Sequence, residues 1–321
     1  MIVAITGGRG LIGRNVIKDF LSKGFEVRSL TRSPISSNHP NLKWFVGDLH
    51  DSIKVLNDLV IDADIVCHCA GEIKDESLFI KTNYEGTINL VEASIKSKVK
   101  KFIHISSVGV YGKNLQGAII ESDELNPMNA YEKSKILADQ WLIDLNSKDI
   151  EVTILRPSVV FDVDMKNKSL KHWIESIYSG HFFFIGGKNS RVNYVHVEDV
   201  KDAINAIVFQ PISKNINIYN LSYSISVEKF VKNICTENNI KYPKLRVPAF
   251  LIMGLALFMD FLSTFLNVKL PLSVSRVKAL NSNVIYDSSK IANELNFFPK
   301  VSLEKRHNGV ANIWLSKKKN V

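Results

Sequence analysis

Residues 2–13 read IVAITGGRGLIG, an apolar run followed by glycines and then by the first residues of an amphipathic pattern. The apolar run predicts a buried strand, and the pattern after it predicts a helix. Between the two, Gly7 permits a tight turn, Gly10 lets the backbone approach a ligand, and Gly13 lets the helix pack close to the sheet. Because a helix N-terminus offers free N–H groups to an anion, this stretch predicts a site for the pyrophosphate of a dinucleotide.

Strand and helix patterns alternate through the first two thirds of the chain. Strands are expected at residues 2–6, 26–30, 43–46, 65–69, 101–106 and 151–156, and helices at residues 11–22, 80–96 and 130–146. Near-continuous apolar strands separated by helices indicate a parallel sheet that is covered on both faces. The expected fold class is therefore α/β, a doubly wound Rossmann sheet whose ligands lie at the carboxyl ends of the strands.

The alternation breaks after Pro157, where short loops, an aromatic run at residues 182–184 and scattered glycines and prolines follow. A strand and a helix within residues 195–209 are expected to return to the main sheet. We therefore assign residues 1–163 and 193–222 to a dinucleotide-binding Rossmann domain. Residues 164–192 and 223–321 are assigned to a smaller C-terminal α/β lobe that binds the substrate.

The composition is that of an ordinary globular protein with a basic balance. The 321 residues are 45% hydrophobic and 23% charged, and their formal net charge is +9. A basic balance suits dinucleotides, sugar diphosphates or an anionic membrane face, although solvated helix faces produce it as well. No basic stretch is interleaved with aromatic residues in a nucleic-acid reading motif, so we expect no nucleic-acid partner.

The three cysteines do not form a disulfide framework. A predicted strand sends Cys67 and Cys69 to one face and His68 to the other. Without another Cys/His pair, we expect a buried strand there and no metal site. Because the chain opens directly with a strand, no signal peptide is expected, and we predict a cytoplasmic, reducing location.

The end of the second predicted strand selects between two cofactors. An acidic residue there would bind the ribose 2′-hydroxyl of NAD, but the chain has Arg32, which can pair with the 2′-phosphate of NADP. An exposed arginine in a turn is the alternative. After the third strand come Asp48 and Leu49, where the carboxylate can accept from an adenine amino group or cap a helix. NADP is favoured, with NAD as the alternative.

Three residues can carry proton transfer. Tyr131 and Lys135 are four residues apart on a predicted helix, so their side chains share a face. An ammonium about 6 Å from a phenol stabilises the phenolate by roughly 2–3 kcal/mol. Together with an oxidised nicotinamide ring it would bring the pKa of Tyr131 towards neutrality, where a phenol exchanges protons with an alcohol. Ser107, after the fifth predicted strand, can hydrogen-bond the same oxygen.

In order and spacing, these motifs resemble those of the extended short-chain dehydrogenase/reductase superfamily, in its branch of NAD(P)-dependent sugar epimerases and dehydratases. The matching stretches are TGGRGLIG at residues 6–13, HCAG at 68–71, NYEGTINLVEA at 83–93, SSVGVYG at 106–112, YEKSK at 131–135, LRPSVVF at 155–161 and NYVHVEDV at 193–200. The resemblance implies that Ser107, Tyr131 and Lys135 are catalytic and that Lys135 also binds the nicotinamide ribose. Further cofactor contacts are expected from the turn residues Gly7, Arg9, Gly10, Leu11, Ile12 and Gly13, and the resemblance adds Ala70, Gly71 and the backbone around Pro157.

Three departures from the family pattern narrow the expected activity. Sugar 4,6-dehydratases of this family carry an Asp-Glu pair just beyond the serine, where this chain has Val108 and Gly109, so we do not expect water elimination. Family members often read VYG after the RP motif, whereas this chain has Phe161 and Asp162, which leaves the local turn open. Epimerases of the family usually hold NAD with an acidic residue after the second strand, so Arg32 points towards reductases.

The C-terminal half is similar to bacterial epimerases that act on polyprenyl-diphosphate-linked N-acetylhexosamine. The similar stretches are FFFIGGKNSRVNYVHVEDV at residues 182–200 and PLSVSRVKAL at residues 271–280, with an apolar stretch between them. By charge and location, Arg191 and Arg276 are candidates for binding a substrate diphosphate. Both also fit as ordinary surface arginines.

The apolar stretch runs from Ala249 to Val268, and its first eleven residues are uniformly apolar. Farther along, Asp260, Ser263 and nearby polar residues fall on one helical face. Because a membrane span needs about 20 largely apolar residues, we do not expect one here. A core helix of the smaller lobe is one interpretation, and a helix lying in the membrane interface is the other.

Taken together, these patterns predict an NAD(P)-dependent epimerase that transiently oxidises C4 of a sugar carried on a nucleotide or polyprenyl diphosphate. The first alternative is an NADPH-dependent 4-keto-sugar reductase. A membrane-associated dehydrogenase of steroid or isoprenoid alcohols and a non-catalytic dinucleotide sensor are more distant alternatives. The expected partner is the diphosphate-linked sugar, and peripheral membrane contact through Ala249–Val268 and a homodimer are open alternatives.

Overall fold

The computed structural model describes residues 1–37, 39–50, 53–112, 116–145, 147–162, 169–210, 215–266 and 274–298. Within these residues, the centre is a seven-stranded sheet in the order β11-β7-β5-β4-β1-β2-β3. The strands are β1 (Ile2–Thr6), β2 (Glu26–Thr31), β3 (Leu42–Val46), β4 (Ile65–His68), β5 (Lys101–Ile105), β7 (Glu151–Pro157) and β11 (Ile216–Leu221). All neighbouring strands in this sheet run parallel, so their carboxyl ends meet at one edge.

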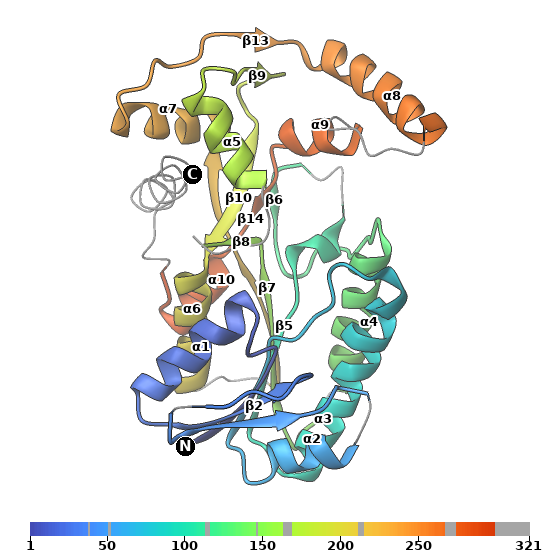
Figure 1. Ribbon diagram of the computed structural model, residues 1–321, viewed down its shortest axis with the longest axis vertical. Coiled ribbons are helices and arrows are strands. Elements are labelled where there is room, and N and C mark those ends of the chain that lie inside the picture. Colours follow the sequence, from blue (N-terminus) through green and yellow to red (C-terminus); the bar gives the residue numbers. More distant parts are fainter. Residues whose placement is uncertain are drawn as a thin grey trace.

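Helices cover both faces of this sheet (Figure 1). One face is covered by α1 (Leu11–Ser22), α6 (Val197–Phe209) and α10 (Ser289–Leu295), and the other by α2 (Ile53–Val60), α3 (Gly86–Lys96) and α4 (Ala130–Leu145). Buried aliphatic and aromatic side chains form a separate core on each face, for example Val16 and Ile204 on one and Leu59 and Leu90 on the other. This architecture confirms the predicted α/β class.

The helix expected at residues 80–96 is present, beginning as a π-helix, η2 (Ile80–Glu85), and continuing as α3. One local expectation was wrong. The strand expected to return to the main sheet, β10 (Arg191–His196), instead pairs with β8 (Val159–Phe161) and β12 (Tyr223–Ser226) in a second sheet. The segment that follows does return: α6 packs beside α1, and the later strand β11 joins the main sheet.

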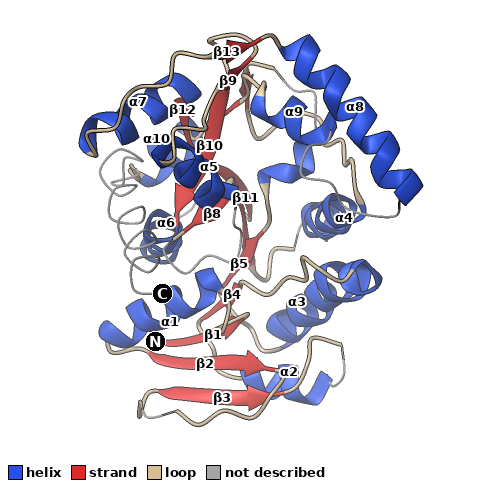
Figure 2. Cartoon of the chain, turned by 45° about the horizontal axis from the view of Figure 1, so that its top comes forward, coloured by secondary structure: helices blue, strands red, loops and turns tan. Residues whose placement is uncertain are grey.

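A smaller lobe lies at the end of the molecule where β9 (Phe184–Ile185) pairs with β13 (Arg246–Val247) (Figure 2). Its helices are α5 (Ser169–Tyr178), α7 (Val227–Glu237), α8 (Ala249–Leu266) and α9 (Val274–Leu280). The lobe has its own aromatic core, in which the rings of Trp173 and Phe230 lie 5.8 Å apart. A third small sheet pairs β6 (Ala118–Ile119) with β14 (Ile285–Tyr286). We therefore propose the division into residues 1–163 with 193–222 and residues 164–192 with 223–321, with β10 at the junction.

Candidate active site

The turn after β1 forms a backbone cradle that fits a pyrophosphate. Gly7 has a φ of 67°, and a Cβ there would lie 2.6 Å from the backbone N of Ala70. A Cβ on Gly13 would lie 2.3 Å from the carbonyl oxygen of Gly7, so the helix can approach the turn this closely only with glycine. The N-cap of α1 is Gly10, which has no capping side chain, and the first N–H groups of the helix are therefore available to an anion.

The other expected cofactor residues lie where neighbouring strands end, at the same edge as the cradle. Ala70 and Gly71 follow β4, and the backbone N–H of Ala70 donates to Oγ1 of Thr6 at the end of β1. Pro157 is the last residue of β7 and is buried. Arg32 follows β2 and is exposed. The parallel sheet thus brings residues far apart in sequence to one edge.

Asp48 and Arg32, two of the expected cofactor-binding residues, have partners close by in the structure. Asp48 Oδ1 accepts from the backbone N–H of Leu49 at 2.6 Å and lies 3.4 Å from Nδ1 of His50. Because α2 begins at Ile53, Asp48 is not at the N-cap position of that helix. Arg32 lies close enough to Glu72 to affect it. Burial raises the pKa of Glu72. Hydrogen bonds from three backbone N–H groups and the charge of Arg32 together lower it by a larger amount, so the pKa of Glu72 is below its usual value.

The three expected catalytic residues come from the end of β5 and the first turns of α4. Lys135 is buried, and its Nζ donates to the carbonyl of Ile105 at 2.8 Å and to Nε2 of His104 at 3.2 Å. Ser107 is half-buried, and its Oγ accepts from the backbone N–H of Gly109 at 3.0 Å. The Tyr131 ring meets the Phe79 ring edge-on, with the centroids 5.8 Å apart.

Lys135 by itself does not lower the pKa of Tyr131, and the expected shift towards neutrality in the presence of an oxidised nicotinamide ring stays a prediction. Burial, with smaller contributions from the carboxylates of Asp139 and Glu132, raises the pKa of Tyr131 to about 12. Burial also lowers the pKa of Lys135 to about 8, against the opposing effect of Asp139. The physical reason is that both groups lose hydration, while the hydrogen bonds of the ammonium go to Ile105 and His104.

Behind Lys135 lies a buried polar network that the sequence analysis did not single out. His104 Nε2 lies 3.7 Å from Asp139 Oδ1, and Asp139 Oδ2 accepts from Nε of Arg156 at 3.0 Å. Arg156 also donates to the hydroxyl of Tyr111, which donates to Oδ1 of Asn220. An arginine inside an apolar strand and a carboxylate four residues after Lys135 are the sequence signals that could have revealed this network.

Asn83 was also missed as a positioning residue. It lies in η2, is 1% exposed, and exchanges two hydrogen bonds with the backbone of Glu72 while donating to Oγ of Ser134. It therefore ties the cofactor-side loop after β4 to the catalytic helix α4. Single-turn π-helices often occur at functional sites, but their position is not visible in an apolar pattern.

His68 and Cys67 lie in β4, Cys69 follows directly after it, and all three are enclosed by the surrounding chain. His68 bonds Oγ1 of Thr6 through Nδ1 at 2.6 Å and Oγ1 of Thr87 through Nε2 at 3.0 Å. Burial, with the Lys135 charge, lowers the pKa of His68 to about 3, and burial raises the pKa of Cys69 to about 12. Among the described residues, no cluster of His, Cys, Asp and Glu side chains could hold a metal ion.

The two substrate candidates are not brought to the catalytic residues by any described contact. Arg191 begins β10 and donates to Oγ and to the carbonyl of Ser224 on β12, at 2.9 and 3.1 Å. Arg276 belongs to α9, but its side chain lies outside the described residues. The Asp162 carboxylate, where the family has a turn glycine, lies 3.9 Å from Arg14 and 3.8 Å from Nε2 of His196.

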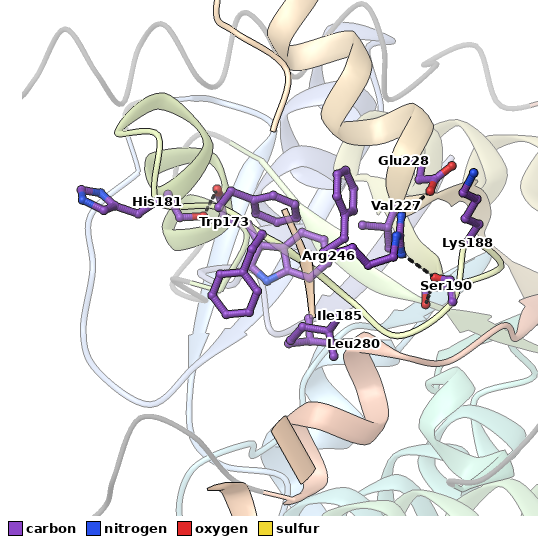
Figure 3. A pocket seen from close by; sticks show the side chains of 14 residues that line it. Trp173, His181, Ile185, Lys188, Ser190, Val227, Glu228, Arg246 and Leu280 are labelled. Atoms are coloured by element: carbon purple, nitrogen blue, oxygen red, sulfur yellow. Dashed lines mark hydrogen bonds and ion pairs between the residues drawn. The ribbon is translucent and has the colours of Figure 1, made fainter. Parts of the chain in front are cut away.

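A pocket of about 180 Å³ opens in the smaller lobe, where its residues include Trp173, Phe183, Lys188, Ser190, Glu228 and Arg246. Arg246 lies along this pocket with its guanidinium towards Glu228, with which it forms an ion pair (Figure 3). The same guanidinium lies 4.7 Å from the centre of the Phe184 ring. Aromatic walls beside exposed Lys188 and half-buried Arg246 suit an anionic ligand with a planar or apolar part. The aromatic run at residues 182–184 was noted in the sequence, but the pocket depends on α5, α7 and β13 packing around it.

Comparison with known proteins decides the family. Residues 3–222 match the model of the NAD dependent epimerase/dehydratase family. The chain belongs to this family. The expected catalytic residues Ser107, Tyr131 and Lys135 and the glycine cradle all lie within the matched residues.

Relatives of this epimerase/dehydratase chain include an enzyme of Escherichia coli O157:H7, the N-acetyl-alpha-D-glucosaminyl-diphospho-ditrans,octacis-undecaprenol 4-epimerase. It is 26% identical over 298 residues, which cover 90% of this chain and 88% of the relative. The uncharacterized protein y4nG of Sinorhizobium fredii is 27% identical over 205 residues, and the match spans 62% of this chain and about half, 51%, of y4nG.

Among solved structures, the UDP-glucuronic acid 4-epimerase of Bacillus cereus in complex with NAD is similar in fold, with a TM-score of 0.69 and 19% identity. The similarity covers 98% of this chain and 100% of that enzyme. Membership of the family establishes that this chain is an NAD(P)-dependent enzyme of the extended short-chain dehydrogenase/reductase superfamily, and the solved structure shows that the fold is shared. This confirms the resemblance on which the sequence analysis relied.

Proposed function

We propose that the protein is a sugar 4-epimerase that transiently oxidises C4 of a hexose linked to a diphosphate. One observation carries the proposal: the end of β5 holds Ser107 and anchors Lys135, while the dinucleotide cradle lies at the same edge of the sheet. Two of the similar proteins support this proposal, because the Escherichia coli relative and the Bacillus cereus fold neighbour are both named as 4-epimerases of diphosphate-linked sugars.

Each of the proposed site residues would have a separate role in the reaction. The cradle at Gly7–Gly13 and the helix α1 would hold the pyrophosphate of the cofactor. The bound nicotinamide ring supplies a hydride acceptor that can return the hydride to C4. Tyr131 would take the proton from the O4 hydroxyl and give it back, while Ser107 would donate a hydrogen bond to the same oxygen. Lys135, held by Ile105 and His104, would stabilise the phenolate through its positive charge.

The surroundings of Ser107 support epimerisation over dehydration. The next residue, Val108, is 7% exposed, and the N–H of Gly109 is hydrogen-bonded to the serine itself. Neither residue offers an acid or a base that could remove water from a 4-keto sugar. The reaction that remains is hydride transfer at C4 with proton transfer at O4.

The carrier of the sugar is proposed to lie in the smaller lobe. The pocket there combines aromatic side chains with Lys188 and Arg246, which suit a diphosphate and the group attached to it. Arg191 directly follows the pocket residue Ser190, and Arg276 lies on α9, so both remain candidates for the diphosphate. Nucleotide and polyprenyl carriers both fit this chemistry.

A 4-keto-sugar reductase is the second candidate, and Arg32 favours it. This exposed side chain follows β2, where the 2′-phosphate of NADP would lie. The test is to incubate the purified protein with diphosphate-linked hexoses and to follow the C4 configuration by NMR. An epimerase interconverts the two C4 epimers without net consumption of added cofactor. A reductase consumes one NADPH for each 4-keto sugar and leaves the saturated hexoses unchanged, which would contradict the proposal.

A further inference from the structure

Helix α8 exposes large apolar side chains along one side. The exposed fractions are 72% for Phe250, 55% for Leu251, 47% for Leu255, 59% for Leu257, 57% for Phe258 and 67% for Phe261. We call these six side chains the outer face of α8. At about 100° per residue their positions span an arc of roughly 160°, so they form one continuous surface.

The polar residues of α8 face the other way. Asp260 is half-buried, and its Oδ2 accepts from the backbone N–H of Val274 at the start of α9, at 3.0 Å. Ser263 is half-buried on the same side, and Ala256 between them is fully buried. A surface helix of a water-exposed protein turns its polar residues to solvent, so this amphipathic order is reversed.

The position of the helix leaves this surface uncovered by the described chain. In Figure 1, α8 lies at the outer edge of the smaller lobe, with α9 on its inner side. No described helix is both long and apolar enough to cross a membrane, α8 included. A contiguous exposed patch of leucine and phenylalanine side chains of this size marks a binding surface.

Charges around the outer face identify what it binds. In the segment between α7 and α8, the exposed charged side chains at residues 241–248 are Lys241 and Lys244, and Lys278 is exposed on α9. Of the nearby acidic side chains, Asp260 is turned inward, Glu228 is paired with Arg246, and Glu237 at the end of α7 is exposed, so basic side chains outnumber free acidic ones here. Exposed lysines in the segments next to a helix with an outward-facing row of leucine and phenylalanine are typical of helices that lie in the interface of an anionic membrane.

We infer that the outer face of α8 docks the protein peripherally onto an anionic lipid bilayer. The six apolar side chains enter the boundary between headgroups and acyl chains, and Lys241 and Lys244, in the segment that leads into α8, lie near the anionic headgroups. A bilayer accepts these side chains together without requiring a surface of complementary shape. Neither the partner nor the site depends on the proposed reaction.

Docking in this way also brings the pocket to the bilayer. Arg246 lines the pocket and lies three residues before α8, and a Cβ on Gly186 would lie 3.2 Å from Cβ of Ala249. The pocket loop and the start of α8 therefore pack together. If the proposed function holds, a sugar diphosphate carried on a membrane lipid is the substrate that this arrangement favours.

The test is sedimentation of the full chain with vesicles of phosphatidylcholine alone and with vesicles containing equal parts of phosphatidylglycerol. We expect binding to the anionic vesicles and several-fold weaker binding to the neutral ones. The double variant Leu255→Ser/Phe258→Ser should lose at least about tenfold in partitioning, because two side chains no longer enter the bilayer. Its melting temperature should stay that of the parent, since both side chains are exposed. Lys244→Gln should weaken binding to the anionic vesicles alone, by about fivefold.

A matched control is Ile53→Ser/Ile61→Ser, which removes two exposed apolar side chains from the region of α2, 70% and 53% exposed. This variant should bind anionic vesicles as the parent does. The inference is overturned if the parent does not bind them, or if the α8 variant binds as well as the parent. It is also overturned if light scattering shows that the α8 substitutions dissociate a dimer that ignores vesicles. Turnover of a nucleotide-linked sugar without vesicles is measured in parallel, so failure of the proposed reaction is seen separately.

Discussion

The buried ammonium of Lys135 donates a hydrogen bond to the imidazole of His104, with Nζ 3.2 Å from Nε2. Because an ammonium can only donate, Nε2 must accept, and the ring is therefore neutral. Burial, reinforced by the Lys135 charge, holds the pKa of His104 well below its usual value, which agrees with this assignment. The pair holds Lys135, the proposed catalytic lysine, at the end of β5 in the protein without substrate.

The first prediction concerns the alkaline limb of the pH profile. The pKa of Lys135 is about 8 because of burial, so kcat/KM should fall as the pH rises through that value and the ammonium is lost. His104→Phe removes an acceptor of the charged form and should shift this fall to lower pH, with about tenfold less activity at neutral pH. His104→Gln keeps an acceptor oxygen and should behave like the parent. Identical profiles for the parent and the Phe variant would exclude this role.

The second prediction concerns acid stability. The pKa of His68 is about 3 in the folded protein and near 6.5 when unfolded, so between these values the unfolded state binds the extra proton. Stability contributed by this group should therefore be lost as the pH falls, by about 2 kcal/mol between pH 7 and pH 5. His68→Gln has no titrating ring, and its melting temperature should fall less over this range. Equal falls in both proteins would show that His68 is not the group responsible.

The third prediction concerns the ion pair behind the catalytic lysine. Asp139→Asn leaves the fully buried Arg156 without its counter-charge, and removal of one partner of such a pair typically costs 3–5 kcal/mol. The free energy of unfolding, measured with urea, should fall by this amount in Asp139→Asn. The matched change Asp144→Asn affects an exposed carboxylate on the same helix and should cost less than about 0.5 kcal/mol. Similar losses in the free energy of unfolding in the two variants would show that the buried Asp139–Arg156 pair contributes no more to stability than an exposed carboxylate.

The fourth prediction concerns cofactor selection. If Arg32 pairs with a 2′-phosphate, Arg32→Ala should weaken the binding of NADPH by roughly 1.5–3 kcal/mol. The binding of NADH should stay nearly unchanged, and fluorescence titration measures both affinities. Arg28→Ala, a substitution within β2 where the arginine pairs with Glu26, should alter neither affinity. Equal losses of NADPH and NADH in Arg32→Ala would show that this arginine does not select the cofactor.

The sequence was sufficient for the main sheet because its signals are local. Apolar β-branched runs specify the strands, and the glycines after β1 are required by a φ of 67° at Gly7 and by the close approach of Gly13 to the turn. The positions of Tyr131 and Lys135 on one helix followed from their spacing of four residues. Each of these features depends on a few neighbouring residues.

Features that depend on packing between distant segments were missed. The sequence of β10 does not show which strands it pairs with. It pairs with β8 and β12, which are distant from it or from each other in sequence, and the main sheet offered an alternative edge. The rise in the pKa of Tyr131 reflects burial by surrounding elements, and the choice of His104 as a partner of Lys135 reflects the approach of α4 to β5. Whether the apolar side of α8 faces the core or solvent likewise depends on where α9 packs.

Transient oxidation at C4 can be followed with a diphosphate-linked hexose that carries deuterium at C4. We expect the wild-type protein to form the C4 epimer with the deuterium retained at C4. Tyr131→Phe should slow this conversion by 10²–10⁴-fold while leaving dinucleotide affinity unchanged, because only proton transfer is lost. Tyr219→Phe, a matched change at a hydroxyl bonded to Glu294, should convert the substrate at the parental rate. Replacement of the deuterium at C4 by solvent hydrogen, or full turnover by Tyr131→Phe, would contradict the account.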